Sequence, residues 1–203
     1  MNARIITMIV AGAAIGLVAA FLLLPQVRER MSPLPESSVS GKALIGGPFT
    51  LVDGTGKHIT EQDYRGRYTL VFFGFTSCPD VCPAGLQLMS AALEKIGSKA
   101  DRITPLFITL DPERDTPAKV ASYVKNFNPR IVGLSGTPDD IAKVAKAYRV
   151  YYQKVPTAGG APGDYSLDHS SIIYLMDPNG EYVTHFTPTT TVDQLTAKLD
   201  KIL

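Results

Sequence analysis

The sequence predicts an α/β fold, a mixed sheet flanked by helices, with an N-terminal transmembrane helix before it. A strand-like segment at 68–75 is followed by a helix-like segment at 84–97 and a second buried strand at 103–110, and such a crossover makes the two strands parallel. Residues 171–186 read as two strands around a Pro-Asn-Gly-Glu turn, which predicts an antiparallel pair at the sheet edge. Residues 5–24 carry no charge, which predicts the membrane-spanning segment.

The apolar segment at 5–24, IITMIVAGAAIGLVAAFLLL, contains 20 residues. At about 1.5 Å per helical residue it crosses the roughly 30 Å of a hydrocarbon core. A cleaved secretory signal is the alternative, with Arg4 as its charged region and VAA at 18–20 as a weak cleavage site. Because the apolar run continues through 21–24, we favour an uncleaved anchor that precedes an exported domain.

The chain divides into three predicted parts: a membrane anchor at 1–30, a flexible tether at 31–47 and one globular domain at 48–203. The tether is rich in Pro, Ser and Gly and lacks periodicity. The whole chain has 203 residues, 45% of them hydrophobic, and a net charge of +1. This composition supports a single core and argues against a nucleic-acid partner.

The domain begins with a predicted hairpin at 49–60, FTLVDGTGKHIT, in which two short alternating runs surround a Gly-Thr-Gly turn. The strand at 68–75, YTLVFFGF, is almost continuously β-branched and aromatic, which is typical of a strand buried on both faces. In the helix at 84–97, apolar residues recur at helical spacing until Gly97 ends it.

Two further helices are predicted after Thr116 and Thr137, because each threonine is a good N-cap residue followed by proline at the first helical position. A short apolar segment lies between these helices. After a glycine-rich loop and the strands at 171–186, Thr190 or Thr191 is expected to cap a closing helix to Leu203.

Cys78 and Cys82, the two cysteines of the chain, lie in FGFTSCPDVCP at the carboxyl edge of the first buried strand, where open α/β sheets place their sites. A helix that began at Pro79 would place Pro83 in its second turn. We therefore expect the helix to begin near Pro83, with Cys82 close to the N-cap and Cys78 in the preceding turn. A helix N-terminus favours thiolate over thiol.

A structural disulfide is the weakest interpretation of this pair, because it would close few residues and stabilise the fold little. Free thiols in an exported domain tend to oxidise unless something keeps them reduced, so the pair is expected to have a chemical role. One such role is a redox site that resembles Cys-x-x-Cys with a longer spacer. The other is a pair of thiolate ligands for a soft metal, which needs one or two further ligands.

The three histidines and the methionines are the candidates for a further ligand. His58 follows a hairpin turn and His185 is expected on an exposed strand face, whereas Met89 and Met176 fit apolar faces of the core. His169 directly precedes a buried strand, so it can reach the edge that carries the cysteines. Two cysteines and one histidine suit trigonal Cu(I), whereas structural zinc usually takes four ligands.

His169 is expected at the tip of a loop that contains Gly159, Gly160 and Gly163. This glycine-rich stretch, TAGGAPGD, would let the imidazole approach a metal or leave it. We therefore expect the loop to be less ordered when no metal is bound.

Three motifs, FTSCPDVCP, TLDPERDTP and LDHSSIIYLMDPNGEY, occur in this order and together resemble the Sco/SenC family of thioredoxin-fold copper proteins, which assist assembly of the binuclear copper centre of cytochrome c oxidase. The resemblance extends from about residue 40 to the C-terminus, and a membrane anchor with a tether is also typical of the family. It implies a thioredoxin-like domain in which Cys78, Cys82 and His169 bind copper as Cu(I), with Cu(II) as a second state. It also implies Asp168, beside the histidine, as an outer-sphere or charge partner.

By this resemblance the chain is a membrane-anchored copper chaperone. It would take copper from a donor chaperone and pass it to the copper-bearing subunit of cytochrome c oxidase. The bacterial inner membrane, with the domain in the periplasm, is favoured over the mitochondrial inner membrane. A disulfide between Cys78 and Cys82 would abolish copper binding.

Two alternatives use the cysteines without a metal. The first is a thiol-disulfide reductase that keeps the cysteines of the oxidase subunit reduced. Thiol oxidoreductases of this fold usually carry a cis-proline where this chain has DHSSII, so the missing proline favours metal binding. The second is a peroxiredoxin-like peroxidase, which ordinarily needs an arginine in its pocket, and the cysteine motif contains none.

The stretch DPERD at 111–115 belongs to the resemblance, but we predict no catalytic role for it. Asp115 and Thr116 are expected to cap the next helix. Arg114 is expected to be either a solvated charge or a contact to a partner.

Overall fold

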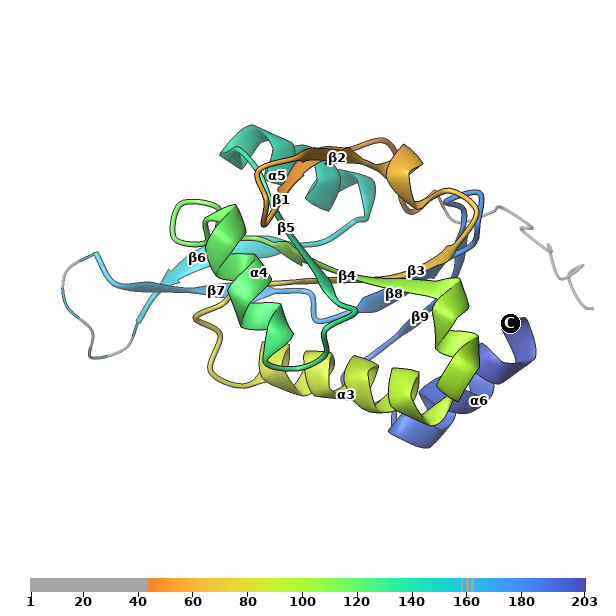
Figure 1. Cartoon of the computed structure of the whole chain (residues 1–203). Coiled ribbons are helices and arrows are strands. Elements are labelled where there is room, and N and C mark those ends of the chain that lie inside the picture. The colour runs from red at the N-terminus through yellow and green to blue at the C-terminus, as the bar shows by residue number, and fades with distance from the viewer. Residues whose placement is uncertain (1–43, 158, 160, 162) are drawn as a thin grey trace, which may run out of the picture. The chain divides into compact units, whose positions relative to one another are not determined.

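The computed structural model describes residues 44–203 except 158, 160 and 162. Seven strands form one sheet in the order β2-β1-β5-β4-β3-β8-β9, and β6 and β7 form a separate two-stranded sheet (Figure 1). The strands are β1 (Thr50–Asp53), β2 (His58–Thr60), β3 (Tyr68–Gly74), β4 (Ile103–Thr109), β5 (Val132–Ser135), β6 (Tyr152–Pro156), β7 (Tyr165–His169), β8 (Ile173–Met176) and β9 (Tyr182–Phe186). The α-helices are α3 (Val81–Lys95), α4 (Pro117–Lys125), α5 (Pro138–Ala147) and α6 (Val192–Ile202), with 3-10 helices η1 (Glu61–Tyr64) and η2 (Gly97–Arg102).

The predicted transmembrane segment at 5–24 and most of the predicted tether lie outside the described residues. Within the described part of the chain, none of the helices has both the length and the apolar character needed to cross a membrane.

The centre of the sheet is mixed, as the sequence predicts. β3 pairs with β4 in parallel, from Tyr68 opposite Ile103 to Gly74 opposite Thr109, and β4 pairs with β5 in parallel. β8 runs antiparallel to β3, and β9 runs antiparallel to β8 at the edge. The parallel strands bring their carboxyl ends to one edge, so the segment that follows Gly74 emerges at that edge.

The sheet is buried on both faces, because successive side chains of a strand point to opposite sides. Phe72 lies under α3, where a Cβ added to Gly85 would come within 2.6 Å of its ring. Phe73 points to the other face and packs against Tyr148, with ring centroids 5.2 Å apart. Figure 1 shows α3 and α6 on one side of the sheet and α5 on the other. Helices on both faces explain the continuous apolar sequence of β3.

The predicted helix starts at the threonines are confirmed. The hydroxyls of Thr116, Thr137 and Thr191 each accept a hydrogen bond from the backbone N–H three residues later. For the closing helix, this result selects Thr191 rather than Thr190 as the cap. Proline follows Thr116 and Thr137 at the first helical position, where its missing N–H costs nothing.

The helix after the cysteine turn begins two residues earlier than predicted, at Val81, with Asp80 as its N-cap. Cys82 is therefore inside the first turn rather than at the cap. Pro83 becomes the third helical residue, and N–H groups in the first turn have no partner within the helix. The proline excludes a start at Pro79, but it is compatible with a start at Val81.

The β6–β7 hairpin is the element that the sequence did not predict. Residues 152–156 and 165–169 fall in the stretch that the sequence predicts as a glycine-rich loop, and the pattern of β6 is mostly exposed rather than alternating. Figure 1 shows this pair extending away from the main sheet. A ribbon that buries little apolar surface gives only a weak sequence signal.

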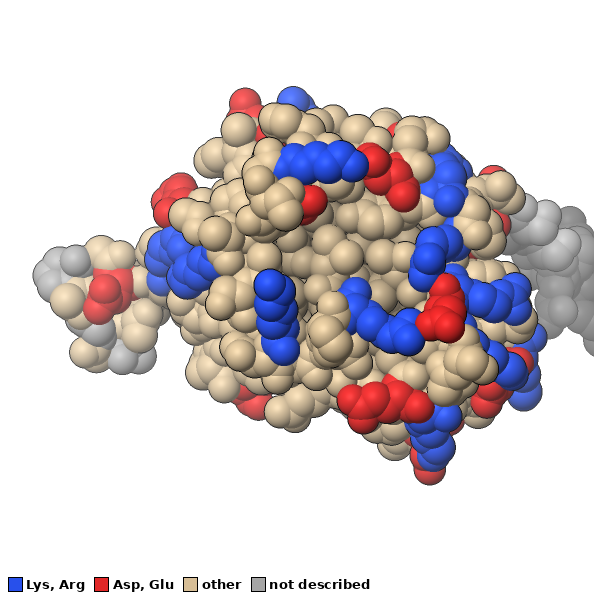
Figure 2. Space-filling model, in the orientation of Figure 1, with Lys and Arg blue, Asp and Glu red and all other residues tan. Residues whose placement is uncertain are grey.

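The charged side chains of the domain are mixed rather than segregated. Figure 2 shows basic and acidic groups interspersed over the visible face. Exposed ion pairs include Lys95 with Asp193 at 2.5 Å and Lys99 with Asp200 at 2.7 Å, which link the end of α3 and the following η2 to α6. Such exposed pairs contribute little to stability.

Candidate metal centre

The cysteine turn starts where β3 ends. The N–H of Cys78 donates to the carbonyl of Phe75 at 3.3 Å, which closes a tight turn directly after the strand. Cys82 lies in the first turn of α3 and is fully buried, and Cys78 is 7% exposed. A Cβ on Gly74 would lie 2.7 Å from the sulfur of Cys82, so this position must be glycine for the sulfur to occupy its place. Strand and helix together fix both sulfurs.

The structure brings His169 to the two cysteines. One ligand atom from each of Cys78, Cys82 and His169 lies within 4.8 Å of the others. The Nε2 of His169 is 3.4 Å from the sulfur of Cys82. The N–H of Cys82 donates to the sulfur of Cys78 at 3.4 Å, as expected near a helix N-terminus.

His169 reaches the cysteines from the end of a strand, which corrects the expected position at a loop tip. It is the last residue of β7 and lies opposite Tyr152 of β6. The loop with Gly159 and Gly163 joins the other ends of these two strands. That loop therefore lies at the far end of the hairpin from the imidazole, and its lower order without metal stays a prediction. Gly160 of the same prediction lies outside the described residues.

The imidazole of His169 is oriented by a backbone carbonyl. Its Nδ1 lies 3.1 Å from the carbonyl oxygen of Ser170. A carbonyl only accepts, so Nδ1 carries a proton, and Nε2 faces the sulfurs. The ring of Phe75 contacts the imidazole edge to face, with centroids 5.8 Å apart. His169 is thus oriented to act as a nitrogen ligand through Nε2.

The pKa of the Cys78 thiol is lowered, and the pKa of the Cys82 thiol is raised. Hydrogen bonding from Cys82, with a smaller contribution from His169, lowers the pKa of Cys78 to about 4. The interaction with Cys78, together with burial, raises the pKa of Cys82 above the ordinary thiol value. The pair therefore holds one thiolate at neutral pH, and the second proton stays on Cys82 until a metal cation replaces it or a base removes it.

The donor set fits a soft, low-coordinate metal ion. Two sulfurs and one imidazole nitrogen match the ligands that Cu(I) prefers, and the described part of the chain adds no fourth His, Cys, Asp or Glu of the kind structural zinc takes. Within the described residues, this is the one cluster of at least three His, Cys, Asp or Glu side chains close enough to hold an ion.

Comparison with known proteins shows the family of the chain. The family model described as SCO1/SenC matches residues 37–203. The chain belongs to the SCO1/SenC family. It is 45% identical over 148 residues to the human "Protein SCO1 homolog, mitochondrial", covering 72% of this chain and 48% of that protein. It is 38% identical over 190 residues to "Protein sco1" of Schizosaccharomyces pombe, covering 93% of this chain and 72% of that protein.

Solved structures of family members confirm the thioredoxin-like fold. The structure described as Bradyrhizobium japonicum ScoI with copper bound matches with a TM-score of 0.72 and 48% identity, covering 78% of this chain and 99% of that one. Yeast Sco1 with copper bound matches with a TM-score of 0.69 and 41% identity, covering 78% of this chain and 86% of that one. The chain spans about half the length of the human relative, 48% of it.

Asp168 does not face the imidazole of His169. It lies on the exposed face of β7, because neighbouring residues of a strand point to opposite sides. The described residues show no hydrogen bond between Asp168 and His169, and the Nδ1 proton is already directed at Ser170. An outer-sphere hydrogen bond from Asp168 is therefore not formed here, and its role as a charge partner stays a prediction.

The remaining predicted candidates lie away from the sulfurs. His58 is exposed on β2, and His185 is exposed on β9 with its Nδ1 2.5 Å from the hydroxyl of Tyr182. Met89 and Met176 are buried in the core, as predicted. His169 is the one histidine of the three that the fold brings to the cysteines.

The stretch DPERD at 111–115 supports the cysteine turn, a role that its sequence did not predict. Asp115 was expected to cap α4, but it is fully buried, and its carboxylate accepts hydrogen bonds from the N–H and the hydroxyl of Thr76 at 2.8 and 2.5 Å. Thr76 begins the cysteine turn, so this aspartate supports the site. A short motif with two aspartates at the end of a buried strand was the available signal.

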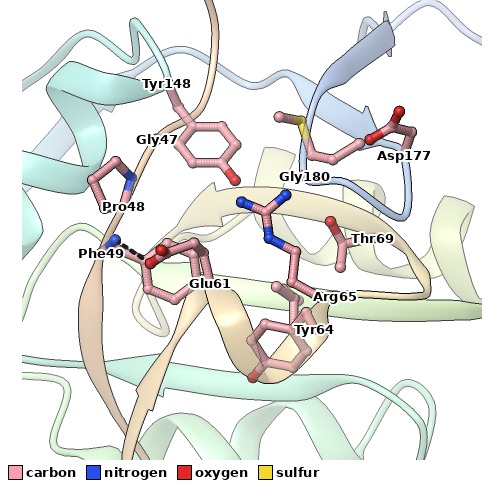
Figure 3. A pocket seen from close by; sticks show the side chains of 12 residues that line it. Gly47, Pro48, Phe49, Glu61, Tyr64, Arg65, Thr69, Tyr148, Asp177 and Gly180 are labelled. Atoms are coloured by element: carbon pink, nitrogen blue, oxygen red, sulfur yellow. Dashed lines mark hydrogen bonds between the residues drawn. The ribbon is translucent and has the colours of Figure 1, made fainter.

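A cavity lies at the opposite end of β3 from the cysteines. It has a volume of about 110 Å³ and is lined by residues that include Arg65, Tyr148 and Asp177 (Figure 3). Thr69, at the start of β3, also lines it, whereas the cysteines follow the end of that strand. The cavity therefore has no part in the metal centre.

Proposed function

We propose that the chain is a membrane-anchored copper chaperone that binds copper through Cys78, Cys82 and His169 and delivers it to the binuclear copper centre of cytochrome c oxidase. The observation that carries this proposal is the cluster of three donor atoms within 4.8 Å. It occurs in a chain 48% identical to a ScoI protein solved with copper bound.

The cellular arrangement is part of the proposal. Residues 1–30 form the anchor and 31–47 the tether, and the thioredoxin-like domain at 48–203 faces the periplasm of a bacterial inner membrane. Relatives include proteins of Rickettsia and mitochondrial proteins. The oxidase subunit as acceptor, and a separate chaperone as copper donor, follow from the family resemblance of the three motifs.

Copper transfer would proceed by ligand exchange on a three-coordinate ion. A thiolate of the acceptor adds to the copper, and the neutral Nε2 of His169 leaves without any proton transfer. A second acceptor thiolate then displaces Cys82 and Cys78 in turn. Because the pKa of Cys82 is raised, its sulfur takes up a proton on release, which drives the exchange forward.

A second function is favoured by the unequal acidities of the two thiols. The Cys78 thiolate would attack a disulfide of the oxidase subunit and form a mixed disulfide, with one subunit sulfur leaving as a thiolate. Cys82 would then lose its proton and attack Cys78, which releases the second subunit thiolate. The subunit disulfide gains two electrons, and the pair Cys78–Cys82 loses them.

Copper stoichiometry and affinity of the reduced chain test the first proposal. We expect one Cu(I) per chain, and we expect His169→Ala to weaken binding by more than about tenfold, since loss of an outer-sphere partner alone has effects of that size. His185→Ala is the matched control, because His185 is exposed on β9 and should leave copper affinity unchanged. Unchanged affinity in His169→Ala would refute the three-ligand site.

Oxidase assembly separates the two functions. If copper delivery is the function, both His169→Ala and Cys78→Ser fail to restore oxidase activity in a strain that lacks the chain. If reductase chemistry is the function, His169→Ala restores activity and the cysteine variants do not.

A C-terminal alkaline phosphatase fusion tests the topology, because that enzyme is active only when it is exported.

A further inference from the structure

The loop at 111–115 contacts both the cysteine turn and the strand that carries His169, which are the two halves of the metal centre. On one side, Asp115 holds Thr76 at the start of the cysteine turn. On the other side, the hydroxyl of Tyr165 donates to Asp111 at 2.8 Å. Tyr165 is the first residue of β7, the strand that ends in His169.

Tyr165 is held by contacts with Asp111, Arg114 and Lys154. The Nη1 of Arg114 donates to the carbonyl of Tyr165 at 2.9 Å, and the guanidinium carbon lies 3.8 Å from the centroid of its ring. The Nε of Arg114 also donates to Asp111, whose side chain is 1% exposed. Lys154 lies against the same ring, 4.5 Å from its centroid. This set of contacts, Asp111 with Arg114 and Tyr165, is called the tyrosine clamp.

The tyrosine clamp lies at the end of the hairpin that is farther from the cysteines. An isolated two-stranded ribbon is only marginally stable, so contacts at its ends decide where it lies. At the end near the cysteines, the N–H of Ser170 donates to the carbonyl of Tyr151 at 2.9 Å, and the N–H of Tyr151 donates to the hydroxyl of Ser170 at 3.2 Å. At the other end the tyrosine clamp holds β7 to the loop at 111–115.

The position of Tyr165 affects the position of His169, because both residues lie on β7. Residues two and four apart in a strand lie on the same face, so Tyr165, Leu167 and His169 face the same way. Leu167 is buried between them. The four residue steps amount to about 13 Å of extended chain, and the rotation of β7 at the clamp therefore changes where Nε2 points.

We propose that Tyr165, held by Asp111 and Arg114, is a positioning residue that aims His169 at the two sulfurs. This inference rests on the proposed three-ligand copper site. The loop at 111–115 is then the common support of both halves, since Asp115 fixes the cysteine turn and Asp111 fixes the histidine strand. Arg114 is a structural contact rather than a solvated charge.

The test removes one hydroxyl from the clamp. Tyr165→Phe keeps the ring, and Tyr151→Phe is the matched control on the same hairpin, because the Tyr151 hydroxyl bonds only to Gln153 among the described residues, at 2.7 Å. Cu(I) affinity of the full chain is measured by competition with a chromophoric Cu(I) chelator. We expect Tyr165→Phe to weaken binding several-fold, up to about tenfold, and Tyr151→Phe to leave it unchanged.

A double-mutant cycle separates positioning from general stability. If Tyr165 acts through His169, Tyr165→Phe has no further effect on copper affinity in the His169→Ala background. The nitrogen hyperfine coupling in the electron paramagnetic resonance spectrum of the Cu(II) form should also weaken in Tyr165→Phe. Asp111→Asn, which removes the charge that holds Arg114, should reproduce both results.

Three results would overturn the inference. Unchanged copper affinity in Tyr165→Phe would show that the clamp does not aim the histidine. An equal loss in the wild-type and His169→Ala backgrounds would show that the clamp acts on the fold as a whole. Unchanged affinity in His169→Ala alone would refute the proposed copper site itself, and the first two results do not have that consequence.

Discussion

The Nε2 of His169 lies 3.4 Å from the sulfur of Cys82, although 87 residues separate them in the chain. Cys82 is fixed by the first turn of α3, and His169 is fixed by the last residue of β7. The two elements meet because β7 leads into β8, and β8 pairs with β3, the strand that precedes the cysteines. The metal centre is thus a product of strand pairing rather than of local sequence.

Cys82→Ala should raise the pKa of Cys78. The hydrogen bond from Cys82 is the largest cause of the lowered value of about 4, so its removal moves the value toward that of an ordinary thiol. Thiolate absorbance in the ultraviolet and the rate of alkylation, each followed against pH, report the midpoint. A wild-type midpoint near about 8.5, the ordinary cysteine value, would contradict the prediction.

The same shift makes the stability of the reduced protein depend on pH. The folded pKa of Cys78 is depressed, so its contribution to the free energy of unfolding is complete above the unfolded value of about 8.5 and is lost as pH falls through about 4. Above the unfolded value, the raised pKa of Cys82 lowers stability instead. Urea unfolding across this range should show stability rising and then falling, and Cys78→Ser should flatten the rising part.

Gly74→Ala should damage the metal centre. The added Cβ would lie 2.7 Å from the sulfur of Cys82 and 2.8 Å from the ring of Phe107, which forces that sulfur to move. We expect weaker copper binding and a loss of about 1–3 kcal/mol in the free energy of unfolding. Gly133→Ala is the control, since its Cβ would lie 2.9 Å from Val120 instead. It should cost similar stability and keep the copper affinity.

Asp115→Ala should destabilise the fold. The substitution leaves donors from Thr76, Thr109 and Lys119 without their acceptor, and Thr109 is fully buried, so its hydroxyl has no access to water. The expected loss is about 2–3 kcal/mol in the free energy of unfolding, measured with urea. Asp193→Ala, at an exposed ion pair with Lys95, should change stability little. Equal effects of the two substitutions would contradict the structure.

Asp168→Asn should lower the copper affinity only slightly, and high salt should abolish the difference. The carboxylate is on the exposed face of β7 and does not bond to the imidazole, so it acts on the site only through screened charge. We expect copper affinity at low ionic strength to fall by roughly twofold, the size of a weak surface interaction, and the difference to vanish at high salt. A large loss that persists in high salt would show a direct partnership with His169.

Much of the fold was predictable because its signals are local. The buried strand β3, the threonine caps of α4 and α5 and the final hairpin each follow from a few neighbouring residues. The β6–β7 hairpin was not predictable, because its polar, glycine-linked sequence lacks periodicity and its position depends on Tyr165 contacting a distant loop.

The position of Cys78 and Cys82 at the turn after β3 follows from the sequence alone, since strand patterns and prolines act over a few residues. The sequence also identified His169 as the third partner, through its place before a buried strand and through the family resemblance. Three further features are set by the folded chain: His169 projects from the end of a strand, Asp168 is turned away from it, and Asp115 is buried beneath the turn. These outcomes depend on which strand faces which, and that is set by packing between segments far apart in the chain.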